Sequence, residues 1–185
     1  TNPVGLESNK ISSLGMDDEY LYIGHDEGVD RYYKAGNPPY VVGDPLWDVD
    51  VFNATSRGVI VNDIVSDEDY VYIAHESVFG AFETYSIGGL WCNNKTSGNW
   101  TQYTNRSEVG DNLSSNEVLS LNQDGESLFI GTDNGLNIMN KDTREIEIIN
   151  YSIAPTFLGG AIYDIYHDNS SSPPQLYMAA APVMN

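Results

Sequence analysis

The stretch NEVLSLNQDGESLFIGTDNGLNIM, residues 116–139, decides the fold class of this chain. Its apolar residues come in three short runs, separated by Gln-Asp-Gly-Glu at 123–126 and by Asp-Asn-Gly at 133–135. Asp-Gly and Asn-Gly supply the positive φ angles that tight hairpin turns require, and no run has helical spacing. The stretch therefore predicts three antiparallel β-strands joined by two tight turns.

The same pattern recurs in weaker form, so that the chain divides into four repeats. An apolar residue of the first strand precedes one of the second by nine residues in the first three repeats, as in Leu121 and Ile130. The loop at 170–174 widens this interval in the fourth repeat. Each repeat exposes apolar faces that only a neighbouring sheet can bury. We therefore expect an all-β fold, a propeller-like radial array of about four antiparallel, four-stranded blades. The expected single domain covers 1–185, with repeats at about 9–57, 58–112, 113–158 and 159–185 plus 1–8.

Two segments are expected to supply the outer, fourth strands. One is 46–52, which follows a proline-containing stretch, and the other is 144–149, where apolar and charged residues alternate. In the second repeat, 86–112 is rich in glycine, asparagine and aromatic residues. We expect this segment to be a solvated insertion.

Composition and charge exclude several classes of partner. The chain has 185 residues, 41% of them hydrophobic, and a formal net charge of −19. That charge repels phosphate backbones and anionic lipid head groups, so we expect no nucleic-acid partner. The sequence also lacks a run of about 18 apolar residues, and we expect no direct membrane insertion. The single cysteine, Cys92, excludes an intrachain disulfide and is expected to be buried or inert.

Signals for N-linked glycosylation are more frequent than the serine and threonine content explains. The chain begins at Thr1, which fits either removal of a signal peptide or excision of a fragment. Together these features predict an extracellular or cell-surface glycoprotein that carries N-linked glycans. The candidate glycosylation sites are Asn53, Asn94, Asn99, Asn105, Asn112, Asn150 and Asn169.

The two ends of the sequence complement each other. The fourth repeat supplies two strands, and residues 1–6 are similar to the opening of a third strand at 132–136. We expect the last blade to be completed by this N-terminal strand, taken from the same chain or from a neighbouring subunit in a homo-oligomer or filament. The third possibility is that the chain is part of a larger propeller. The assembly candidates are Val4, Gly5, Leu6, Tyr177, Met178 and Ala179.

Residues 115–138, SNEVLSLNQDGESLFIGTDNGLNI, resemble the repeat of the two-component regulator propeller family. Residues 10–33 resemble it less closely, and the other two repeats weakly. The tryptophan that usually precedes Ile-Gly-Thr in this family is replaced by Tyr22, Tyr72, Phe129 and Tyr177. The resemblance implies a β-propeller fold and an extracellular sensor or binding module.

The sequence contains no recognisable catalytic motif, and we expect neither an enzyme nor a bound cofactor. His25 and His75 occupy equivalent repeat positions, where hydrogen bonding at a strand end is favoured over a metal pair. The acidic turns lack the spacing of known Ca²⁺ loops, so Ca²⁺ is only a weak alternative to solvated turns. Aromatic residues at Tyr32, Tyr33 and 91–103 could line a carbohydrate or protein contact.

These features predict a non-enzymatic structural or interaction protein, a glycosylated surface or filament subunit assembled through β-strand contacts. The alternative is a ligand-sensing or carbohydrate-binding propeller ectodomain that belongs to a larger sensor. An enzyme built on a propeller, such as a lyase or sialidase, is the third possibility, and the small number of arginines argues against it.

Overall fold

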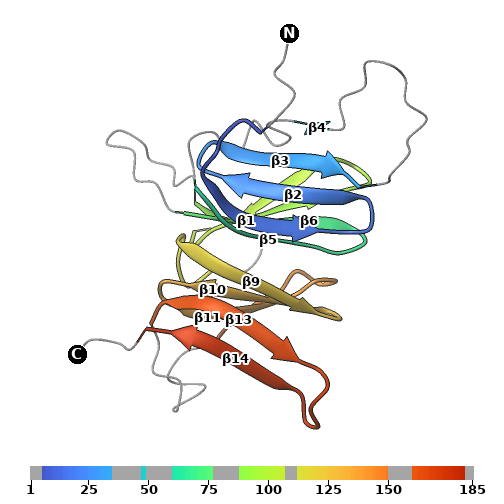
Figure 1. The fold of residues 1–185 in the computed structure, drawn as a ribbon. Coiled ribbons are helices and arrows are strands. Elements are labelled where there is room, and N and C mark those ends of the chain that lie inside the picture. Colours follow the sequence, from blue (N-terminus) through green and yellow to red (C-terminus); the bar gives the residue numbers. More distant parts are fainter. Residues whose placement is uncertain are drawn as a thin grey trace, which may run out of the picture.

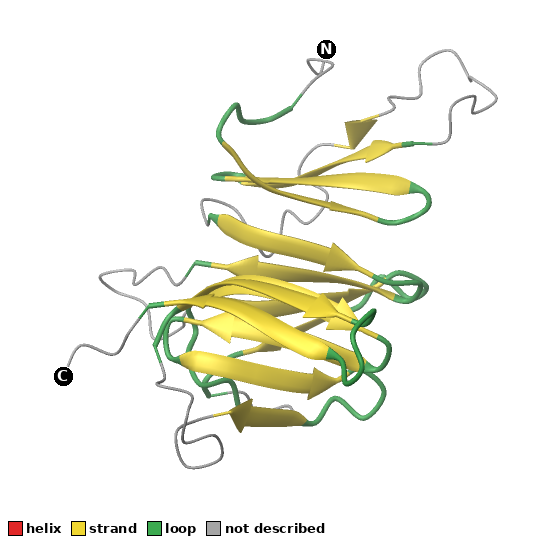
Figure 2. Ribbon diagram, turned by 60° about the horizontal axis from the view of Figure 1, so that its bottom comes forward, coloured by secondary structure: helices red, strands yellow, loops and turns green. Residues whose placement is uncertain are grey.

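A computed structural model of the chain describes residues 6–34, 47–48, 60–76, 88–106, 112–149 and 160–181. In this part the chain forms strands and loops without a helix, which confirms the all-β class (Figure 2). The strands form four antiparallel sheets that follow one another along the sequence. Within the described residues no helix has the length and apolarity needed to cross a membrane.

The first sheet has the order β1-β2-β3-β4, with strands Ile11–Met16, Tyr20–His25, Gly28–Tyr33 and Trp47–Asp48. The second has the order β5-β6-β7-β8, with strands Val61–Ser66, Tyr70–His75, Gly89–Asn94 and Trp100–Tyr103. The third has the order β12-β11-β10-β9, with β9 at Val118–Asp124, β10 at Ser127–Thr132, β11 at Gly135–Asn140 and β12 at Ile146–Ile149. In the fourth, β13 (Ile162–Asp168) pairs with β14 (Gln175–Ala180).

In the third sheet, the two tight turns lie at the Asp-Gly and Asn-Gly pairs of the sequence. Strands β9 and β10 pair from Ser127 opposite Asp124, and the turn between them places Gly125 at φ 49°. Strands β10 and β11 pair up to Thr132 opposite Gly135, where φ is 106°. Both glycines adopt the left-handed backbone that residues with a Cβ disfavour. The predicted turns and the predicted outer strand of this sheet are therefore confirmed.

The expectation of a solvated insertion at 86–112 is wrong. This segment holds β7 and β8, and the side chains of Leu90, Cys92 and Tyr103 lie in the core. The long connection of this sheet lies earlier, between β6 and β7, and most of it falls outside the described residues. The prediction failed because the asparagine and glycine residues at 93–99, which end β7 and form the turn to β8, have a composition typical of loops.

The sheets are stacked through their first strands. β1 contacts β5, β5 contacts β9, and β9 contacts β13, so that the array runs from the first sheet at the top of Figure 1 to the fourth at the bottom. The core is divided among the three junctions between sheets. At the first junction Tyr22 packs with Ile64, and at the third Phe129 packs with Ile162 and Ile165.

Small residues allow successive sheets to approach closely. A Cβ on Gly15 would lie 2.7 Å from the carbonyl oxygen of Ile64, and one on Gly24 would lie 2.7 Å from Cγ1 of Val61. At the third junction, a Cβ on Gly131 would lie 2.7 Å from the carbonyl oxygen of Ile162. Real Cβ contacts are longer, so these glycines set the spacing of the sheets.

A leucine-to-alanine pair tests whether the core lies between sheets. Leu121 and Leu14 hold the same position in β9 and β1, but Leu121 is 4% exposed and Leu14 is 61% exposed. Leu121→Ala is expected to lower the free energy of unfolding by about 3 kcal/mol, and Leu14→Ala by less than about 1 kcal/mol. Denaturant unfolding of dilute protein measures both. Equal losses would contradict the assignment of the core.

Candidate functional site

Two clefts open between successive sheets, at the acidic turns that join the first two strands of each sheet. The larger lies between the first and second sheets and has a volume of about 1130 Å³. The smaller lies between the second and third sheets and has a volume of about 400 Å³. Since both clefts use the same repeat positions, their walls can be compared residue by residue.

In the larger cleft, Asp17 joins the first sheet to the second. Its carboxylate accepts hydrogen bonds from the backbone N–H groups of Glu19 at 2.9 Å and Tyr20 at 2.7 Å. The hydroxyl of Tyr22 donates to the same carboxylate at 2.9 Å. Lys95, which follows β7 of the second sheet, donates from Nζ to Oδ2 of Asp17 at 2.6 Å. This bridge therefore connects two sheets.

The smaller cleft repeats this arrangement with Asp67. Its carboxylate accepts from the backbone N–H groups of Asp69 at 3.0 Å and Tyr70 at 2.8 Å. The hydroxyl of Tyr72 donates to it at 3.2 Å, and Lys141 of the third sheet donates from Nζ at 3.0 Å. An aspartate, a tyrosine and a lysine of the next sheet are thus a recurring set at both junctions.

Each cleft also contains an arginine stacked on a tyrosine. The guanidinium of Arg31 lies 4.4 Å from the ring centroid of Tyr20, which is 5.5 Å from that of Tyr33. In the second cleft, Arg144 lies 3.9 Å from the ring centroid of Tyr70. Such surfaces offer a flat apolar face beside hydrogen-bond donors, which suits a ligand with both apolar and hydroxyl-bearing sides.

The aspartates of both clefts are held as carboxylates. Burial raises the pKa of Asp17, but hydrogen bonds from Lys95, from the backbone of Tyr20 and from the hydroxyl of Tyr22 outweigh it and lower the pKa to about 2. The balance is the same for Asp67, where the contact with Lys141 and the turn N–H groups lower the pKa despite burial. Both tyrosine hydroxyls remain protonated, because burial raises their pKa. They can therefore serve as donors.

Sequence reasoning missed the lysines of these bridges. Lys34, Lys95 and Lys141 each follow the third strand of their sheet and make the same backbone hydrogen bond to the acidic turn. Lys34 follows Asp17, and Lys141 follows Asp124, at the same interval of 17 residues. The long connection of the second sheet hides this signal for Lys95.

The two equivalent histidines are both fully buried. Nδ1 of His25 accepts from the backbone N–H of Glu27 at 3.1 Å, and its Nε2 lies 3.3 Å from Oδ2 of Asp30. The ring of His75 lies 6.4 Å from that of Trp91, and among the described residues neither of its nitrogens has a hydrogen-bond partner. In the described part of the chain, no group of three or more His, Cys, Asp or Glu is arranged to hold a metal ion.

Most glycosylation candidates in the described residues lie on the surface. Asn99, Asn105, Asn112 and Asn169 are exposed, whereas Asn94 is half-buried at the end of β7 and accepts hydrogen bonds from Ser97. Asn53 and Asn150 lie outside the described residues. Cys92 is a buried free thiol, and burial raises its pKa to about 12. Its predicted burial is confirmed.

The structure separates the assembly candidates. Tyr177, Met178 and Ala179 lie on β14 at the far end of the array and are exposed. Leu6 lies near the first sheet, where the N–H of Glu7 donates to Asp30 at 2.8 Å (Figure 1). Val4 and Gly5 lie outside the described residues. Completion of the fourth sheet by residues 1–6 stays a prediction.

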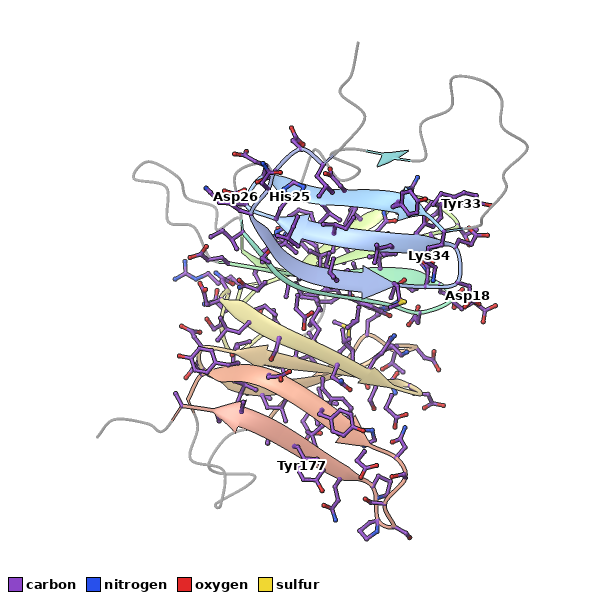
Figure 3. All side chains as sticks on the ribbon, viewed as in Figure 1. Asp18, His25, Asp26, Tyr33, Lys34 and Tyr177 are labelled. Carbon is purple, nitrogen blue, oxygen red and sulfur yellow. The ribbon has the colours of Figure 1, made fainter. Side chains whose placement is uncertain are left out.

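The other predicted aromatic surface is partly core. Trp91 and Trp100 are half-buried, with ring centroids 6.2 Å apart and an edge-on geometry, and Tyr103 is buried. Tyr33 stands at the same end of the first sheet as Asp18 and Lys34 (Figure 3). Tyr33 does not line the larger cleft itself, but its ring centroid lies 5.5 Å from that of Tyr20, which does.

Comparison with solved structures finds the same fold in extracellular sensor domains. The extracellular domain of a protein described as the hybrid two component system BT3049 from B. thetaiotaomicron matches 95% of this chain with a TM-score of 0.65 and 17% identity. That of BT4673 from the same organism matches 97% with a TM-score of 0.61 and 22% identity. This chain covers 22% and 21% of those chains, about one fifth of each.

A computationally designed protein, Ika4, matches 95% of this chain with 95% of its own length, at a TM-score of 0.57 and 10% identity. No family model and no curated protein matches the sequence. The sensor domains fit the resemblance of residues 115–138 and the expected extracellular location.

Removal of the lysine in the larger cleft tests the inter-sheet bridge. Lys95→Met is expected to raise the pKa of Asp17 from about 2 toward its usual value, because the hydrogen bond from Lys95 is lost. Carboxyl carbon chemical shifts, followed by NMR as the pH is varied, measure this change. Lys10→Met, which removes an exposed bridge to Asp26, should leave Asp17 unchanged. An unaltered Asp17 titration in Lys95→Met would contradict the bridge.

The buried His75 predicts a dependence of stability on pH. Burial lowers its pKa to about 4, so the unfolded chain, with a pKa of about 6.5, binds more protons between these values. The free energy of unfolding therefore decreases as the pH falls from about 6.5 toward 4. His75→Thr, which copies Thr132 of the third sheet, is expected to reduce the loss between pH 7 and 4.5 by about 2 kcal/mol. Urea unfolding across this range measures it, and an identical pH profile in both proteins would contradict it.

Proposed function

We propose that this chain is a propeller segment of an extracellular ligand-sensing domain and that it binds a neutral carbohydrate in the cleft between the first and second sheets. The observation that carries the proposal is the fold that it shares, over almost its whole length, with extracellular domains of bacterial sensor systems. In this proposal the four sheets are consecutive blades of a β-propeller.

The arrangement of the first strands supports the propeller. β1, β5, β9 and β13 lie side by side in sequence order, as the innermost strands of successive blades do (Figure 1). The close approach at Gly24 recurs at Gly131, so the first and third junctions share this contact. The chain spans about one fifth of the sensor domains it matches, so a partial ring is the form that the proposal requires.

The chemistry of the larger cleft supports a neutral, hydroxyl-rich ligand. Tyr20 and Arg31 present a stacked surface, while acidic side chains at the cleft mouth, such as Glu19 and Glu68, offer hydrogen-bond acceptors. Carbohydrates have apolar ring faces and many hydroxyl donors, and both kinds of group find a counterpart here. The formal charge of −19 opposes binding of polyanionic sugars.

Binding of uncharged oligosaccharides to the purified chain tests the function. Tyr20→Ala is expected to weaken binding at least tenfold, about 1.4 kcal/mol, because it removes the face on which Arg31 stacks. Isothermal titration against neutral and anionic oligosaccharides measures the affinity. Tyr163→Ala removes an exposed tyrosine of the fourth sheet and should leave binding unchanged. Failure to bind any neutral sugar, or equal weakening by both variants, would overturn the proposal.

A further inference from the structure

The first strand of each sheet has two apolar positions that pack against the preceding sheet. In the second, third and fourth sheets these positions are 4% exposed or less. In the first sheet the same positions are Ile11, 42% exposed, and Leu14, 61% exposed. Within the residues that the structure describes, the first sheet therefore presents a junction surface with no sheet against it. The buried equivalents are Val61 and Ile64, Val118 and Leu121, and Ile162 and Ile165.

The opposite end of the array shows the other half of a junction. Tyr22, Tyr72 and Phe129 point toward the following sheet from the second strand and are buried. The equivalent residue of the fourth sheet is Tyr177, which is 51% exposed. Ala179 matches Gly24, so the small residue that admits the next first strand is present as well. Figure 3 shows Tyr177 at the far end of the array from Lys34.

The charged groups divide between the two ends in the same way. Asp168 holds the position of Asp17 and Asp67 in the fourth sheet, and Lys34 holds the position of Lys95 and Lys141 in the first. Within the described part of the chain, Lys34 is exposed and its Nζ makes no hydrogen bond or ion pair. One half of an aspartate–lysine bridge therefore stands at each end.

As far as the structure describes the chain, the third junction lacks both the tyrosine and the lysine that the other two junctions contain. Asp124 has no lysine against it within the described residues, and His167 lies 3.2 Å from its carboxylate instead. The aromatic residue at this junction is Phe129, which cannot donate to a carboxylate. Tyr177 at the end of the array retains the hydroxyl, as Tyr22 and Tyr72 do where a lysine follows. The end surface thus matches the two junctions that contain the bridge.

We propose that the two end surfaces are halves of one junction and that a second copy of this chain joins them head to tail. Tyr177 of one copy packs on Ile11 and Leu14 of the next, and Lys34 of the next copy binds Asp168. The occupant is a second copy because the first and fourth sheets, which carry the two halves, lie at opposite ends of the array and so cannot meet within one copy (Figure 1). Charge complementarity and the repeated junction set both favour it.

A charge exchange tests the bridge. Lys34→Asp and Asp168→Lys are each expected to weaken self-association at least tenfold, because each places like charges opposite one another. The double variant restores the pair and is expected to associate as the natural chain does. Glu145→Lys, an equal charge change on the third sheet away from both end surfaces, should not weaken association. Sedimentation velocity over a range of concentrations in about 0.15 M salt, which screens the repulsion between the acidic chains, measures this.

Disulfide trapping tests the geometry. A mixture of Lys34→Cys and Asp168→Cys is expected to give a covalent dimer on mild oxidation, whereas each variant alone is not, since Cys92 is buried. A chain that stays monomeric at every concentration would overturn the proposal. So would a variant with both cysteines that forms only an internal disulfide, which would show closure of one chain on itself, or a double charge variant that fails to regain association.

Discussion

A sheet of this protein can bury its apolar faces only against another sheet, and the rest of the structure depends on that constraint. Each sheet carries apolar residues on both faces, so the core is divided into layers between neighbours. Glycines at the second strands bring the next first strand to van der Waals distance, as Gly24 does for Val61. Close packing of apolar side chains at this distance therefore stabilises the stack of sheets.

Polar groups at the junctions fix how one sheet sits on the next. Asp63 of β5 accepts the backbone N–H of Leu121 at 2.8 Å, and the hydroxyl of Ser120 donates to the carbonyl of Ile162 at 3.0 Å. Burial raises the pKa of Asp63, although the N–H groups oppose this effect. Burying such polar groups carries a desolvation penalty, but their hydrogen bonds form only when the two sheets have one particular orientation. Together with the lysine bridges, they define one orientation for each pair of sheets.

Much of the fold could be predicted from the sequence because each repeat encodes its own hairpins. Asp-Gly at 124–125 and the nine-residue interval located β9 and β10. Alignment of the other repeats with this pair located the first two strands of every repeat. The strands β7 and β8 could not be located, because the sequence between β6 and β7 has no periodic pattern that would mark where the sheet resumes. The site was harder still. Lys95 and Asp17 are far apart in sequence, and only the stacking of two sheets brings them together.

Because two sheets form the larger cleft, the binding proposed there depends on how these sheets are stacked. The walls of the larger cleft come from two sheets, with Tyr20 and Arg31 on the first and Lys95 on the second. A ligand that touches both walls stabilises one separation of the sheets over others, because its contacts depend on that separation. The same lysine already holds Asp17, and it also donates to the backbone carbonyl of Asp67. Any ligand group that takes Lys95 away from these partners must replace both hydrogen bonds, so occupancy of the cleft and the geometry of the array are energetically coupled.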